Sequence, residues 1–165
     1  MSAPPKTPRQ RSDRNAKEVA ELFARALQHY QRGDRRAAGE QLQAVLARQP
    51  DHVGSLHQLG IIALQNGQPD LAIELIGRAI ALNEQVPDFH YNIGIAYGSI
   101  GKFDQAIAHN RKAIELKPDH GPEFVILGQA LRAQGGTDEA VDSGVTGQAG
   151  VQQDSRKKFF EVCIS

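Results

Sequence analysis

The sequence predicts an all-α protein in which antiparallel pairs of short helices stack side by side, and two observations carry this prediction. The first is an internal repeat, because residues of one kind return every 34 positions along the 165-residue chain. The second is that each period holds two apolar stripes at helical spacing with a glycine between them. The repeating columns are Gly33, Gly67, Gly101 and Gly135; Ala38, Ala72, Ala106 and Ala140; and the small residues Ala26, Gly60, Gly94 and Gly128.

Each period therefore predicts two helices, and the third period shows them most clearly. Its first stripe covers 89–100 and ends at Gly101, which breaks the helix. Its second stripe covers 103–116, and Pro118 stops it. Proline suits the first turn of a helix, because its missing N–H would have no partner there. Helix starts are accordingly predicted at Pro69, Pro87 and Pro122.

The small residues inside the helices predict a close crossing of the two helices of a pair. Gly60, Gly94 and Gly128 lie in the middle of first helices, where glycine costs about 1 kcal/mol relative to alanine. That cost is tolerable if a neighbouring helix must pass closely over the same face. The repeated alanines of the second helices have the same interpretation.

These units resemble the tetratricopeptide repeat. The matching small and apolar positions are Leu59, Gly60, Ala72 and Ala79 in the second unit, Ile93, Gly94, Tyr97, Ala106, Ala113 and Pro118 in the third, and more weakly Ala26, Gly33, Ala38, Leu42 and Pro50 in the first. The resemblance implies a right-handed α-solenoid of about 3.5 units. Its units are 19–52, 53–86, 87–120 and a partial unit over 121–142.

The sequence also departs from the family pattern. A position that often carries tryptophan is filled by Leu22, Leu56, His90 and Phe124. Arg25 replaces an apolar residue, and Glu84 replaces a unit-ending proline.

The two ends differ from the array, which is predicted over 18–142. Residues 1–17 carry five basic residues, one acid and three prolines, which favours a disordered basic arm. That arm is interpreted chiefly as a solubilising leader, with an electrostatic tether as the alternative. Over 143–165 the repeat is lost, so this irregular tail is interpreted as disordered or as out of frame through a frameshift or truncation. No polar cap is visible at this end, which makes self-association possible.

Composition limits the classes of function. Lysine plus arginine number 19, against 19 aspartate plus glutamate, so no global basic excess favours nucleic acid as a partner. The one cysteine cannot form an intramolecular disulfide. No apolar run approaches the roughly 20 residues that span a bilayer. A cytoplasmic protein with no membrane partner is expected.

No catalytic or cofactor motif accompanies the repeats, so no enzyme activity, cofactor or metal is predicted. Cys163 lies in the tail without a partner thiol, and the six histidines lack cysteine or carboxylate partners at ligand spacing. Asp70 and Glu74, four apart on a helix, are interpreted as a solvated face and not as an acid–base pair.

The resemblance implies that a concave groove lined by the first helices binds a partner. The implied lining residues are Phe23, Leu27, Tyr30, His57, Gln58, Ile61, Gln65, Asp88, Tyr91, Asn92, Ile95, Gln129 and Arg132. Their mixture of apolar contacts and amides suits an extended peptide backbone. The positions at which related chaperone-binding domains hold a carboxylate lack cations here, and Asn92 alone matches the asparagine ladder of O-linked N-acetylglucosamine transferases.

Two functions follow from this sequence. The first is a non-catalytic module that binds a protein or peptide segment in the groove. The alternative is the N-terminal repeat part of a larger bacterial glycosyltransferase or methyltransferase, which would present substrate to a catalytic domain outside this chain. A nucleic-acid-binding role for the basic arm is the weakest interpretation.

Overall fold

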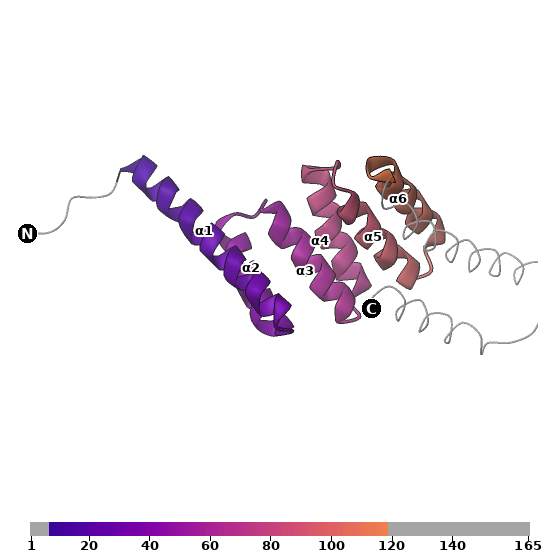
Figure 1. The fold of residues 1–165 in the computed structure, drawn as a ribbon, viewed down its shortest axis with the longest axis horizontal. Coiled ribbons are helices and arrows are strands. Elements are labelled where there is room, and N and C mark those ends of the chain that lie inside the picture. The colour runs from indigo at the N-terminus through magenta and orange to yellow at the C-terminus, as the bar shows by residue number, and fades with distance from the viewer. Residues whose placement is uncertain (1–6, 119–165) are drawn as a thin grey trace, which may run out of the picture.

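A computed structural model describes residues 7–118 of the chain, and these residues are all-α, which confirms the predicted fold class. Six helices follow one another along the long axis in chain order (Figure 1). They are α1 (Pro8–Gln31), α2 (Arg35–Arg48), α3 (Val53–Gln65), α4 (Pro69–Leu82), α5 (Pro87–Ser99) and α6 (Phe103–Leu116). The partial unit over 121–142 and the tail over 143–165 lie outside the described residues.

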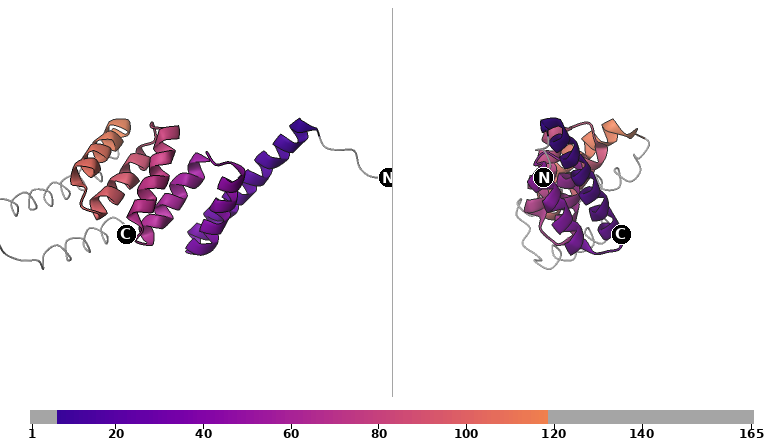
Figure 2. Two further views of the ribbon diagram at one scale, coloured as in Figure 1. Left: turned by 180° about the vertical axis from the view of Figure 1, so that it is seen from behind. Right: turned by 90° about the vertical axis from the view of Figure 1, so that its left-hand side faces the viewer.

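The helices pack as three pairs, α1 with α2, α3 with α4 and α5 with α6, and the pairs join through α2 with α3 and α4 with α5. The same succession of helix pairs is seen from behind in the left view of Figure 2. One core cluster runs through the second and third pairs, with Leu56 and Ile76 fully buried in it. A second cluster around Leu42 joins the first pair to Ile62 of α3.

The turn within each pair is set by a repeated glycine. Gly33, Gly67 and Gly101 have φ of 81°, 69° and 77°, in the left-handed region that glycine adopts without steric cost. Each comes just after a first helix, so the chain reverses there and the second helix packs back on the first. The glycine column of the sequence is therefore a column of turns.

The glycines inside α3 and α5 mark close crossings, as the sequence predicts. A Cβ atom added to Gly60 would collide with the Ile76 side chain of α4. One added to Gly94 would lie 2.5 Å from Oδ1 of Asn110 on α6. The partner residues Ala72 and Ala106 are fully buried at the same crossings. Gly128 and Ala140 lie outside the described residues.

The predicted disordered arm is wrong for residues 8–17, which form the first turns of α1. Thr7 caps this helix: its Oγ1 accepts from the N–H of Gln10 at 3.3 Å, while the Gln10 side chain accepts from the Thr7 N–H at 3.0 Å. Pro8 occupies the first turn, where proline fits. The prolines and basic residues of this segment suggested disorder, whereas the Thr7 cap and a proline in the first turn favour a helix.

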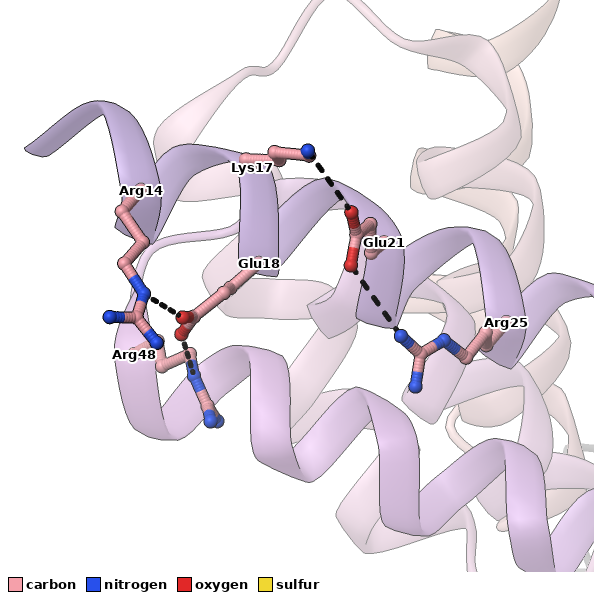
Figure 3. A network of polar contacts seen from close by, with 6 residues as sticks. All are labelled: Arg14, Lys17, Glu18, Glu21, Arg25 and Arg48. Carbon is pink, nitrogen blue, oxygen red and sulfur yellow. Dashed lines mark hydrogen bonds and ion pairs between the residues drawn. The ribbon is translucent and has the colours of Figure 1, made fainter.

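Ion pairs one turn apart also support the beginning of α1 (Figure 3). Arg14 contacts Glu18 at 2.8 Å, and Arg25 contacts Glu21 at 3.5 Å. Glu18 also meets Arg48 of α2 at 3.6 Å, which ties the long first helix to its partner. The Arg14 hydrogen bond and the nearby positive charges hold the pKa of Glu18 below its usual value. Within residues 8–17, Arg14 and Lys17 are therefore each paired with an acid one turn further along the helix.

Candidate interaction surface

The first helices of neighbouring pairs are linked by polar side chains, beginning with α1 and α3. Gln65, the last residue of α3, donates from Nε2 to the Tyr30 hydroxyl at 2.8 Å. Its Oε1 accepts from Nε of Arg35, the first residue of α2, at 3.0 Å. Tyr30 and Gln65 are both half-buried. The Gln65 amide thereby uses both of its ends to hold the first unit against the second.

The link between α3 and α5 is built in the same way. Nδ2 of Asn92 lies 2.9 Å from Nε2 of His57 and 2.9 Å from the carbonyl oxygen of Asp88. The His57 ring also packs on Phe89, with the ring centroids 4.5 Å apart. His57 and Asn92 are half-buried, so both remain partly open to solvent.

Burial shifts the pKa values of two histidines at α3 in the direction that favours the neutral ring. Burial lowers the pKa of His57, and the Asp88 carboxylate opposes that shift only in part. Burial likewise lowers the pKa of His52, whose Nδ1 accepts the Ser55 N–H at 3.1 Å and so caps α3. A protonated Nδ1 could not accept that bond, because it would carry a hydrogen.

Other residues implied for the groove differ in how far they are exposed. Phe23 meets His52 edge to face with ring centroids 4.8 Å apart, and a Cβ on Gly54 would lie 2.8 Å from the Phe23 ring. Tyr91 packs against the main core cluster and is half-buried. Leu27, Gln58 and Ile61 are half-buried and Asp88 is exposed.

One implied lining residue lies mainly in the core. The side chain of Ile95 is 5% exposed and belongs to the main core cluster. It therefore offers little surface to a partner, and its apolar character is explained by packing. Gln129 and Arg132 lie outside the described residues.

Gln58 stands out because it carries an unused donor. Its Nε2 atom is buried and finds no hydrogen-bond partner among residues 7–118. A buried amide without a partner is costly, and such groups in native proteins call for an explanation. Gln58 occupies the position in α3 that Asn92 occupies in α5, one period later.

Sequence reasoning missed the residues that tie the units together. Neither the contact of Arg35 with Gln65 nor the 3.1 Å approach of the His90 and His109 Nδ1 atoms was predicted. The two links between first helices share a sequence separation of 35, one more than the period. A search for polar residues 35 positions apart would have found both links, because this separation connects facing positions on neighbouring first helices.

The side chains that link α1, α3 and α5 are suited to binding another chain and not to catalysing a reaction. Half-buried amides and aromatic rings can accept, donate and pack against a bound chain. Within residues 7–118 no group of three or more histidine, cysteine, aspartate or glutamate side chains could hold a metal ion. In the same range no helix is long and apolar enough to cross a membrane.

Family models for the tetratricopeptide repeat match residues 53–86 and 87–120. Those are the bounds of the second and third predicted units, so each of these two units matches the tetratricopeptide repeat over its full length.

Three particular proteins illustrate the likeness. A curated relative, small glutamine-rich tetratricopeptide repeat-containing protein 2 of Mycosarcoma maydis, is 37% identical over 90 residues, which are 54% of this chain and 25% of the relative. The solved O-GlcNAc transferase of Thermobaculum terrenum, a K341M mutant, is 32% identical with a TM-score of 0.63, over 65% of this chain and 21% of that one. The Yersinia enterocolitica type III secretion chaperone SycD, solved with a peptide of the translocator YopD, is 21% identical with a TM-score of 0.66, over 72% and 95% of the two chains.

Proposed function

We propose that this protein is a non-catalytic interaction module that binds a peptide or an extended protein segment along the first helices α1, α3 and α5. The observation that carries the proposal is the row of half-buried polar and aromatic side chains on these helices, linked from unit to unit by Tyr30 with Gln65 and by His57 with Asn92. An extended backbone presents alternating N–H and C=O groups, and side-chain amides can pair with both.

Further support comes from a protein of similar fold. SycD was solved in complex with a peptide of a translocator, and its fold overlaps 72% of this chain. The structural likeness makes a peptide ligand a reasonable expectation here. Which kind of peptide binds has to be inferred from the side chains that this chain presents.

Selection of peptides followed by mutation tests the proposal. Peptides chosen from a random displayed library on the full-length protein are measured by calorimetry against the double variant Tyr91→Ala, Asn92→Ala. We expect affinity to fall by about tenfold or more, because a few residues near the centre of an interface carry a large share of its binding energy. The single variant Asn92→Ala is included because Tyr91 also packs against the core.

A matched control lies on α4, where Leu71 and Glu74 are exposed. The variant Leu71→Ala, Glu74→Ala is expected to leave peptide affinity within about twofold, since surface positions outside an interface contribute little. Circular dichroism melts establish that each variant is folded. Equal losses in both double variants, or a library that yields no binder, would contradict the proposal.

The alternative function rests on one comparison. The chain is 32% identical to the transferase from Thermobaculum terrenum but spans 21% of its length. A repeat segment that presents substrate to a catalytic domain would use the same face of α1, α3 and α5. Coding sequence that continues the repeats in frame into a transferase domain would favour this alternative over a free-standing module.

A further inference from the structure

The amide of Asn92 has both of its donor hydrogens committed inside the protein. Its Nδ2 atom lies 2.9 Å from the carbonyl oxygen of Asp88. A carbonyl oxygen can only accept, so the Asn92 atom beside it has to be the nitrogen and not the oxygen. The same nitrogen lies 2.9 Å from Nε2 of His57. One hydrogen therefore goes to Asp88 and the other goes to His57.

This geometry also determines the form of the His57 ring. An amide nitrogen donates and does not accept, so Nε2 of His57 has to be the acceptor. His57 is then neutral and carries its hydrogen on Nδ1. The ring is further positioned by its packing on Phe89 at 4.5 Å between centroids.

What remains for a partner is the carbonyl oxygen of Asn92. Within residues 7–118 no hydrogen bond reaches Oδ1, and Asn92 is half-buried on α5. We propose that His57 is a positioning residue: its neutral ring holds Asn92 so that Oδ1 alone is presented, and its protonation releases the amide. The bound segment would then place a hydrogen-bond donor, such as a backbone N–H, at Asn92. This inference rests on the proposed function, because it assigns a specificity and a control to the same face.

Protonation of His57 disrupts its contact with Asn92, because both groups would then be hydrogen-bond donors. A hydrogen on Nε2 of His57 would face the NH2 group of Asn92 at 2.9 Å, and two donors repel. The Nε2–H can instead donate to the Asp88 carbonyl, the other group that Asn92 uses. Asn92 then loses His57 as an acceptor and shares the Asp88 carbonyl with the ring, so one hydrogen of its NH2 group is released for a donor bond to a partner.

The charges around His57 come mainly from one side. Asp88 on α5 is exposed, and its carboxylate favours the protonated ring. The acidic residues of α4, Asp70 and Glu74, are exposed, and Arg78 of the same helix donates to the Pro50 carbonyl at 3.1 Å. On α2, Arg35 contacts Gln65 at the C-terminal end of α3. Burial lowers the pKa of His57, so the change is expected below its ordinary value of 6.5.

Nuclear magnetic resonance of the full-length protein without any ligand tests this inference. At pH 8 we expect His57 to carry its hydrogen on Nδ1, and the Asn92 NH2 signals to be shifted and slow to exchange. As the pH is lowered, the Asn92 signals should move with the same midpoint as the His57 ring. A hydrogen on Nε2 at pH 8, or Asn92 signals that do not change while His57 titrates, would overturn the proposal.

Two variants separate the side-chain roles. Asp88→Asn keeps the backbone carbonyl but removes the carboxylate, so the His57 hydrogen should stay on Nδ1 while the midpoint moves to lower pH. His57→Phe should abolish the titration of the Asn92 signals, whereas the control His29→Gln on α1 should leave it unchanged. If His57→Phe fails to fold, the position of the hydrogen on the His57 ring of the unaltered protein still tests the proposal. Because no peptide is used, failure here leaves the proposed function standing.

Discussion

The second and third units share a backbone and differ in what fills their cores. Three equivalent positions are apolar in the second unit, namely Leu56, Leu75 and Ile76, and polar in the third, namely His90, His109 and Asn110. Leu56 and Ile76 are fully buried and Leu75 is 9% exposed, while His90 is 5% and Asn110 is 1% exposed. One repeated fold therefore tolerates two kinds of core.

The polar core of the third unit is only partly satisfied. Nε2 of His90 donates to the Glu84 carbonyl at 2.9 Å, so its Nδ1 can accept from Nδ1 of His109 at 3.1 Å. The His109 ring stacks on Tyr97 with centroids 5.6 Å apart. Asn110 differs, because its Nδ2 and Oδ1 atoms are both buried and no partner for either lies among residues 7–118. Both units therefore keep a close helix crossing, at Gly60 and at Gly94. The side chains packed around the crossing are apolar in the second unit and polar in the third.

The largest effects are expected from exchanging the residue that faces each crossing glycine. Ile76→Ala should destabilise the protein by about 2–5 kcal/mol, because it leaves a cavity at a fully buried site. Asn110→Ile should stabilise it by about 1–3 kcal/mol, because it removes a buried amide that has no partner. Chemical denaturation measures both. A loss of stability in Asn110→Ile would show that the third unit needs the amide.

Acid should affect the third unit through its histidines. Burial, and then the neighbouring His90, lower the pKa of His109 from its ordinary value of 6.5. The unfolded chain therefore binds protons at higher pH than the folded chain, and this contribution to stability is lost as the pH falls below 6.5. Melting temperatures between pH 7.5 and 5.5 should fall less in His109→Leu than in the unaltered protein. Equal falls would mean that groups other than His109, such as His52 and His57, account for the acid sensitivity.

The smallest and most uniform effect is expected at the turns. Gly67→Ala and Gly101→Ala should each destabilise the protein by about 1 kcal/mol, because both residues have positive φ in equivalent turns of two units. An added Cβ at Gly67 would meet no atom within 4 Å, so backbone conformation alone accounts for the cost there. Thermal melts of the two variants should shift alike. A large difference would indicate that the units diverge in backbone as well as in core.

Much of the fold could be predicted because the same pattern of small and apolar residues returns every 34 positions, so each unit confirms the interpretation of the others. Gly60 and Gly94 lie where two helices cross closely, and the turn glycines have positive φ. Both situations require glycine, so the residue type alone indicates them. The pairing of His57 with Asn92 could not be predicted in the same way, because it depends on the relative placement of two units. The helical start of α1 escaped detection because its cap and ion pairs are local and polar and add nothing to the apolar stripe.

The most direct test of the account is to map where a library-selected peptide contacts the protein. Backbone and side-chain resonances of the full-length chain are followed as the peptide is added. The account predicts that the largest changes occur at His57, Gln58, Tyr91 and Asn92 on α3 and α5. Changes centred instead on Leu71 and Glu74 of α4, with these four residues unaffected, would contradict it.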